Sequence, residues 1–259
     1  MNSTNEADTA PQPSLSDRVL NGIVENLLAA SRRPELTTLY HYTSAEGACG
    51  IVDSQSMWAT DVRFLNDSSE WRYAVQLVRT VVGDPAISKH EDWGDLTDEF
   101  HALSKMTCHV TCFSANRNQL SQWRAYSGQG YALGFPWPYL ATLAANLPLT
   151  GIFSPVVYDP ALQRAALAKA LSPLLAENPA DSDADGLPHR VIFVGAVSVA
   201  ATFFKDPAFS QEAEWRLAVI PPDNALQQQM PLQYRTVRGA VDPYRVLQLS
   251  SVTIPTTGI

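Results

Sequence analysis

Cysteine is scarce in this chain, which has only Cys49, Cys108 and Cys112. So few cysteines, in odd number, do not build the disulfide framework of a small secreted protein. Cys108 and Cys112 lie close to His109, a combination that can ligate zinc. In a strand, however, alternation puts both cysteines on one face and His109 on the other. We therefore expect buried core cysteines, no metal, and a reducing compartment.

Basic residues are also few. The chain has 18 Lys and Arg against 26 Asp and Glu, a net charge of −8 and a pI of about 5.0. Binding to a nucleic-acid backbone without sequence preference needs clustered Lys and Arg. We do not expect such binding as the main role, although a local basic groove is compatible with this composition.

Long apolar runs are absent from the sequence. The longest, over residues 191–204, is shorter than the roughly 20 residues that a membrane helix needs. The polar, acidic N-terminus has no basic segment followed by an apolar one, as a signal peptide would. We expect no membrane partner and a cytoplasmic location, or delivery to a target cell if the protein is an effector.

The usual motifs of nucleotide binding and hydrolysis are missing too. The sequence contains no GxGxxG, P-loop, HExxH or nucleophile elbow. Gly128 and Gly130 lead into an expected strand, whereas a phosphate-binding loop leads into a helix. The acidic segment 178–188 resembles a calcium loop only superficially, because the glutamate that closes an EF-hand is absent after Gly186.

Helical and strand patterns are mixed along the chain without regular βαβ alternation, which indicates an α+β fold in one domain. Residues 1–13 have the composition of a disordered leader, and residues 14–259 form the expected domain. We expect helices near 14–30, 45–54, 68–82, 95–105, 119–126, 137–146, 160–177 and 189–204, and strands near 36–43, 57–60, 105–115, 131–135, 152–158, 212–220, 231–237 and 244–249.

The most informative stretch is residues 210–220, SQEAEWRLAVI. As a strand it places Glu212, Glu214 and Arg216 on one face, with the two carboxylates roughly 7 Å apart, and Trp215 on the other face. One interpretation is an edge strand with solvated charges and an internal Glu–Arg pair. The other is that the paired carboxylates face a pocket and one of them takes part in chemistry.

A second local pattern lies at residues 66–70. Asp67 can cap a helix whose third residue is Glu70, in a capping-box arrangement. We expect Asn66, Asp67 and Glu70 to brace a loop beside the site. The pattern is compatible with a plain helix cap or with a contact to substrate.

Several short blocks together resemble a widespread bacterial domain-of-unknown-function family, family 2971. They run over most of the chain, from about residue 39 to residue 249, and comprise LYHYT at 39–43, FLND at 64–67 with Glu70, CFS at 112–114, Trp123 with Tyr126, GYALGF at 130–135, Lys205, and EAEWR at 212–216. Phe209 stands where the family pattern has tryptophan. The chain also ends where related sequences continue through a closing strand.

We associate this family with the ADP-ribosyltransferase superfamily. The resemblance implies a split, strongly bent pair of β-sheets that grips NAD, as a substrate, without a metal. It implies that Glu214 is the catalytic carboxylate, that Glu212 engages the acceptor, and that His41 faces the same cleft as Glu214 and binds a ribose hydroxyl. The further NAD-binding residues that it implies are Tyr42, Thr43, Phe113, Ser114, Trp123 and Tyr126, with Phe113 or Tyr126 stacked on the nicotinamide.

The chemistry of such a site matches these residue types. Breaking the bond between nicotinamide and ribose builds positive charge on the ribose, which a fixed carboxylate stabilises. The resemblance thus implies an NAD-dependent ADP-ribosyltransferase or NAD glycohydrolase, in a toxin, effector or phage-defence role, with a protein, nucleic acid or water as acceptor. The alternatives are a non-catalytic nucleotide- or ligand-binding domain and a protein-interaction domain on the same fold.

Overall fold

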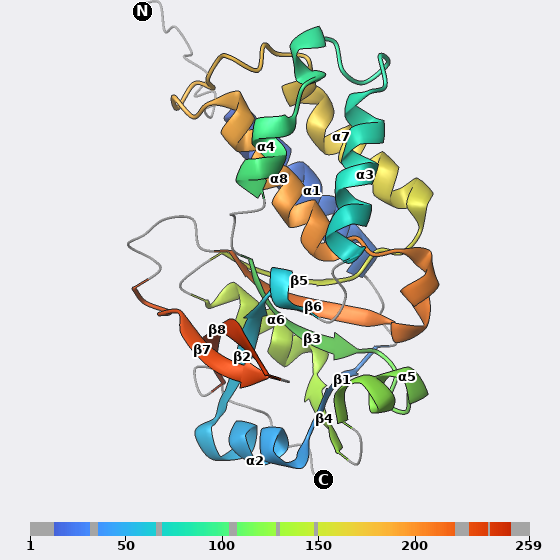
Figure 1. Ribbon diagram of the computed structural model, residues 1–259, viewed down its shortest axis with the longest axis vertical. Helices are drawn as coiled ribbons and strands as arrows, with labels where there is room; N and C mark the ends of the chain where they lie inside the picture. Colours follow the sequence, from blue (N-terminus) through green and yellow to red (C-terminus); the bar gives the residue numbers. More distant parts are fainter. Residues whose placement is uncertain are drawn as a thin grey trace, which may run out of the picture.

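A computed structural model describes residues 13–31, 36–65, 69–103, 108–127, 130–147, 150–220, 228–237 and 239–249. They form a mixed α+β fold in which a layer of helices covers a curled, antiparallel sheet (Figure 1). Each helix and strand expected from the sequence is present, with ends that differ by a few residues. The expected leader over residues 1–13 lies almost wholly outside the described residues.

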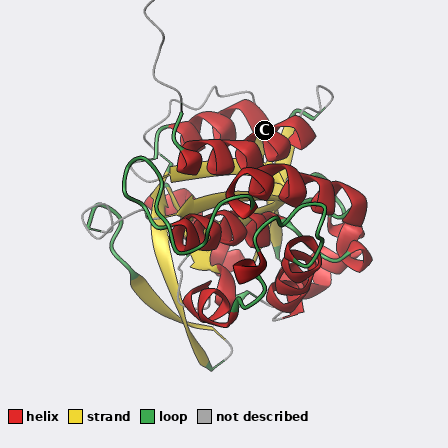
Figure 2. Ribbon diagram, turned by 90° about the horizontal axis from the view of Figure 1, so that it is seen from above, coloured by secondary structure: helices red, strands yellow, loops and turns green. Residues whose placement is uncertain are grey.

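The helix layer consists of α1 (Leu15–Ser31), α3 (Ser69–Val82), α4 (Thr97–Leu103), α7 (Pro160–Leu175) and α8 (His189–Phe203). Seen from above, these helices lie over the strands (Figure 2). Helix α8 is apolar on almost all sides because it is buried in the middle of this layer. Within the described part of the chain, no helix is both long enough and apolar enough to cross a membrane.

Capping residues in the sequence explain where two of the helices, α2 (Ala45–Ser54) and α7, begin. Ser44 caps α2 by accepting a hydrogen bond from the backbone N–H of Gly47 at 3.1 Å. Asp159 caps α7 in the same way, and Pro160 occupies the first turn, where its missing N–H costs nothing. Both helices thus begin at residues that the sequence marks as starts.

The sheet has a forked topology centred on β3 (His109–Ser114). One edge of β3 pairs along its length with β6 (Glu214–Ile220), which in turn pairs with β5 (Thr150–Pro155). The other edge is shared by two strands: β1 (Thr38–Thr43) pairs at Ser114, and β2 (Ser56–Asp61) pairs at His109 and Val110.

Each of these two strands begins an arm of the fork. In the first arm β1 pairs with β4 (Tyr131–Pro136), and in the second β2 pairs with β8 (Ala240–Gln248) and then β7 (Gln233–Val237). Helix α2 connects the arms and lies at the bottom of the molecule in Figure 1. The sheet is therefore split between β1 and β2.

The two faces of β3 and β6 support two cores. The helix-layer face carries Val110 and Ala218, which pack with Phe193 of α8. The opposite face, which we call the α6 face because α6 (Trp137–Ala145) covers it, carries Phe113 and Trp215. Burial of an apolar side chain of this size stabilises the fold by roughly 1.5–3 kcal/mol. The two cores hold the central strands in place, and they therefore also fix the positions of the side chains at the strand ends.

One expected boundary is wrong, and it matters for the site. Strand β6 begins at Glu214, whereas Glu212 ends a 3-10 helix, η4 (Pro207–Glu212). Between them, Ala213 has a φ of 43° in the left-handed region. Because this turn breaks the strand, Glu212 and Glu214 do not follow the alternation predicted from the sequence.

Candidate functional site

Three carboxylates and two cations form a buried charge cluster at the start of β6. Lys205 Nζ lies 2.8 Å from Glu70 Oε1, 2.6 Å from Glu212 Oε2 and 3.2 Å from Glu214 Oε2. Arg216 donates from Nε to Glu214 Oε1 at 2.8 Å, and from Nη2 to Glu70 Oε2 at 2.8 Å and Glu214 Oε2 at 3.0 Å. The cluster therefore joins α3, the end of α8 and β6.

Glu212 and Glu214, the two glutamates of the EAEWR block, differ in solvent exposure and in how many of their carboxylate oxygens are bound. The Glu214 side chain is 7% exposed and both of its oxygens accept hydrogen bonds, whereas the Glu212 side chain is 18% exposed and is bound through Oε2. Burial by itself would raise the pKa of Glu214, but Arg216 and Lys205 outweigh it and lower that pKa to about 2. For Glu212, burial dominates and raises the pKa.

The cations are held by backbone and side-chain contacts from the helix layer. Arg216 donates from Nη1 to the carbonyl oxygen of Thr202 at 2.7 Å, near the end of α8. The Gln163 side chain of α7 donates to the carbonyl oxygen of Lys205 at 2.9 Å and accepts from the Tyr73 hydroxyl. Phe209 lies below Lys205, with its ring centre 4.9 Å from Nζ. The cluster is thus rigidly built.

His41 occupies the fork of the sheet. Its Nδ1 lies 2.9 Å from the carbonyl oxygen of Cys112, and its ring meets Phe113 edge-on with centroids 5.9 Å apart. A carbonyl oxygen only accepts, so Nδ1 carries the proton of this hydrogen bond. Burial, with a smaller effect from Arg235, lowers the pKa of His41. The ring is therefore neutral at pH 7, and its Nε2 is a hydrogen-bond acceptor.

His41 and Glu214 were expected to face the same cleft. The pairing of the strands does not place them on the same face. Ser114 is paired with Tyr40 on one side and with Glu214 on the other, so these three share the helix-layer face. Alternation places His41 on the α6 face, in agreement with its contact to Phe113. The two side chains lie on opposite faces of the sheet at the fork.

Phe113 and Ser114, two of the residues expected to bind NAD, make contacts that hold the surrounding structure in place. Phe113 is buried in the core of the α6 face among Phe135 and Phe153, and so is not free to stack on nicotinamide. Ser114 is also buried, and its hydroxyl donates to the carbonyl oxygen of Glu212 at 2.7 Å and accepts from the N–H of Asn116 at 3.1 Å. Ser114 therefore positions the turn that carries Glu212.

The remaining expected residues gather near the end of β1. The Tyr42 hydroxyl donates to the carbonyl oxygen of Asn116 at 2.7 Å, and its ring meets Trp123 edge-on with centroids 4.7 Å apart. Thr43 faces α2, where a Cβ at Gly47 would collide with its hydroxyl. The Tyr126 side chain, and the whole of Asn66 and Asp67, lie outside the described residues.

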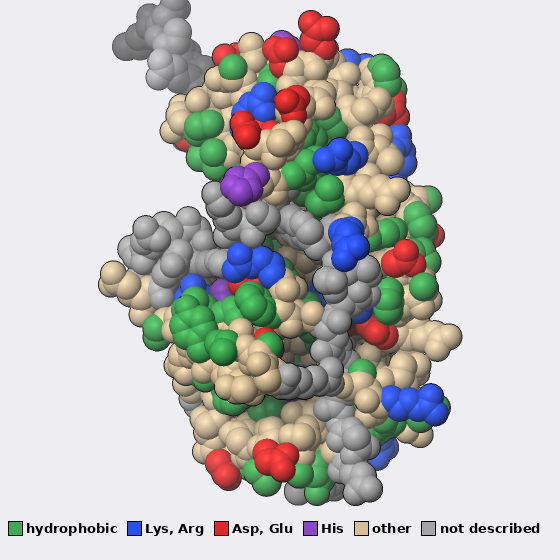
Figure 3. Space-filling view, in the orientation of Figure 1, with side chains coloured by type: hydrophobic (Ala, Val, Ile, Leu, Met, Phe, Trp, Pro, Cys, Tyr) green, Lys and Arg blue, Asp and Glu red, His purple; other side chains and the backbone are tan. Residues whose placement is uncertain are grey.

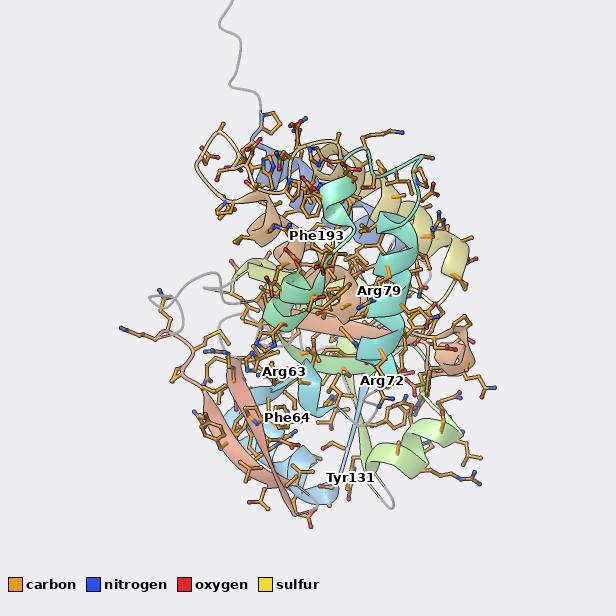
Figure 4. The ribbon with its side chains drawn as sticks, turned by 45° about the horizontal axis from the view of Figure 1, so that its top comes forward. Arg63, Phe64, Arg72, Arg79, Tyr131 and Phe193 are labelled. Carbon is orange, nitrogen blue, oxygen red and sulfur yellow. The ribbon has the colours of Figure 1, made fainter. Side chains whose placement is uncertain are left out.

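The face of the molecule that shows the fork is hollowed at its centre, below the helix layer (Figure 3). Figure 4 places Arg63 and Phe64 on one side of this central hollow, Arg72 on the other and Tyr131 below. All four side chains are exposed. Arg72 follows Glu70 in the first turn of α3, so this turn links the rim of the hollow to the charge cluster.

Comparison with known proteins identifies one related family. Residues 122–217 match the model of the family described as "Protein of unknown function (DUF2971)". The matched range includes the GYALGF block, Lys205 and the EAEWR block, and so supports the domain-of-unknown-function family that the motifs indicate. Neither a curated protein nor a solved structure matches the chain.

Sequence reasoning missed the contacts of three residues. Glu70 was expected only beside the site, as part of a capping box, and it binds both cations of the cluster. Lys205 was recognised as a family position without a function, and it joins all three carboxylates. Arg235, on β7, carried no sequence signal because its neighbours in the fold are distant in the chain.

Proposed function

We propose that the protein binds NAD in the central hollow and breaks the bond between nicotinamide and ribose, with Glu212 as the carboxylate that stabilises the developing positive charge. One observation carries this choice: Glu214 is fully engaged by Arg216 and Lys205, whereas Glu212 is more exposed and binds Lys205 through one oxygen. A carboxylate with an uncommitted oxygen can reach a ligand.

Other features support the same proposal. The sheet is split and curled, a histidine lies on the first strand, and carboxylates lie at the start of a late strand, as the resemblance to ADP-ribosyltransferases implies. Neutral His41 offers an acceptor nitrogen to a ribose hydroxyl. On this proposal His41 contributes from the fork, and Glu212 from the charge cluster that Lys205 connects to Glu70 of α3.

The reaction needs no further cofactor. The electron pair of the bond between ribose C1′ and the nicotinamide nitrogen leaves with nicotinamide. The oxygen of water, or a nucleophile of an acceptor, then bonds to C1′ and loses a proton. A preorganised charge of this kind typically contributes on the order of a hundredfold or more in rate. Glu212 supplies it in the proposal, and Lys205 holds its carboxylate in place.

A second candidate function is non-catalytic binding of a nucleotide. It is favoured by the neutralisation of the cluster, because Lys205 and Arg216 already compensate most of the carboxylate charge. In this case the hollow holds the ligand without stabilising a cation.

Calorimetric titration with NAD, followed by an assay of nicotinamide release, separates these possibilities. We expect wild type to bind NAD and release nicotinamide, and Glu212→Gln to bind NAD but lose at least a hundredfold in release. Binding without release by wild type favours the second candidate. Absence of NAD binding contradicts both candidates, and full turnover by Glu212→Gln contradicts the role of Glu212.

A further inference from the structure

Arg235 is held in a fixed position on the arm of the sheet formed by β2, β8 and β7. Its guanidinium carbon lies 5.1 Å from the ring centre of Trp58 and 5.7 Å from that of Tyr244. These two rings lie 4.6 Å apart with an interplanar angle of 35°. Nη2 donates to Thr60 Oγ1 at 2.8 Å. The side chain is therefore oriented by two aromatic rings and one hydroxyl.

In the part of the chain that the structure describes, Arg235 forms no ion pair with a carboxylate. By contrast, Arg63, Arg164, Arg190 and Arg216 each form an ion pair with an Asp or Glu. Asp242 is the cross-strand partner of Arg235 and forms no ion pair with it. Burial lowers the pKa of Arg235, and the opposing effects of Asp242 and Tyr244 offset only part of this shift.

One donor of the guanidinium is also unused. Arg235 Nε is buried and has no hydrogen-bond partner among the described residues. Leaving a buried donor unpaired costs roughly 1–3 kcal/mol, and more when the group is charged. An acceptor at Nε would remove this cost, and a guanidinium matches the paired oxygens of a phosphate.

The surroundings of Arg235 favour a nucleotide over a bare anion. Trp58 is 47% exposed, so an aromatic surface is available to a base beside the guanidinium. Arg235 pairs with Asp242, and Thr60 pairs with Tyr244, so Arg235 is on the same face of its arm as Trp58 and Thr60. The guanidinium and the exposed ring of Trp58 therefore lie on the same side of the sheet.

We propose that Arg235, oriented by Trp58, Tyr244 and Thr60, binds a phosphate group of a nucleotide. This inference goes beyond the proposed function, because phosphate binding at Arg235 is independent of any chemistry at Glu212. The competing interpretation is a surface cation–π cluster that only stabilises the arm, by about 0.5–1 kcal/mol.

Calorimetric titration with ADP, with adenosine as the matched ligand without phosphate, tests the proposal. We expect wild type to bind ADP more tightly than adenosine, and Arg235→Gln to lose about 10- to 100-fold in ADP affinity with little change for adenosine. Asp242→Asn should bind ADP more tightly than wild type, because it removes the negative charge opposite Arg235.

Arg79→Gln is the control variant. Arg79 also lies over an aromatic ring, that of Phe100 at 4.7 Å, but in the helix layer away from the fork (Figure 4). We expect its ADP affinity to equal that of wild type. Circular dichroism establishes that each variant is folded before its titration is interpreted.

The results that overturn the phosphate site differ from those that overturn the proposed function. Equal ADP affinities of folded Arg235→Gln and wild type, or equal affinities of wild type for ADP and adenosine, overturn the phosphate site. Loss of ADP affinity in Arg235→Gln with no nicotinamide release from NAD by wild type supports the phosphate site and overturns the proposed chemistry.

Discussion

Arg216 binds Glu214 through two donors on the same strand, with Nε 2.8 Å from Oε1 and Nη2 3.0 Å from Oε2. Both side chains are buried, so each charge depends on its partner. Removing one partner of such a pair is costly, whereas replacing both can be nearly neutral. The pair, with Lys205 and Glu70, anchors the start of β6 to the helix layer.

Arg216→Met should lower the free energy of unfolding by about 3–5 kcal/mol, because it leaves the buried carboxylates of Glu214 and Glu70 with Lys205 as their shared cation. The double variant Arg216→Met with Glu214→Gln should be more stable than the single variant. Urea denaturation measures both. A double variant no more stable than Arg216→Met would show that the pair is not the source of the loss.

Stability should fall in acid because of Glu214. Its folded pKa is about 2 against an ordinary value of 4.5, so below pH 4.5 the unfolded chain binds a proton that the folded chain does not. The stabilisation is fully present above about pH 4.5 and is lost as the pH falls towards 2, by about 3 kcal/mol.

Denaturation at a series of pH values measures this dependence, and Glu214→Gln is the control. We expect the curve of the variant to be flatter between pH 4.5 and 2. Parallel curves for variant and wild type would assign the acid sensitivity to other carboxyl groups.

Thiol labelling should separate the three cysteines. Cys49 is exposed, whereas burial raises the pKa of Cys108 to about 12 and raises that of Cys112 well above its ordinary value. Because the thiolate is the reactive form, we expect a maleimide at pH 7 to modify Cys49 rapidly and the other two only on unfolding. Cys49→Ser is the control, and rapid labelling of that variant would contradict the burial of β3.

The fold was largely predictable because its signals are local. Alternation, apolar periodicity and caps such as Ser44 depend on neighbours in sequence, and they predicted the α-helices and strands to within a few residues, although not the 3-10 helices. The error at Glu212 has a local cause as well. Ala213 adopts a left-handed conformation that alanine rarely shows, so nothing in the sequence marked the end of the alternation there.

The site was less predictable because its contacts are long-range. Glu70 is 146 residues from Arg216, and Arg235 is 175 residues from Thr60. The relation of His41 to Glu214 depends on the register of β1 on β3, which the sequence of either strand does not determine. Residue types therefore indicated which side chains matter, and only the topology showed which of them meet.

Changing His41 to Asn should weaken ligand binding without unfolding the protein. The amide N–H of Asn can replace the Nδ1 donor to the carbonyl oxygen of Cys112, but Asn has no counterpart of Nε2. We therefore expect an unchanged thermal midpoint and a loss of about tenfold in NAD affinity, as is typical for one hydrogen bond. His41→Leu, which also lacks the donor, is the matched control and should be both less stable and weaker in binding. If His41→Asn binds NAD as tightly as wild type, the imidazole only closes the fork of the sheet, and the ribose must be bound elsewhere.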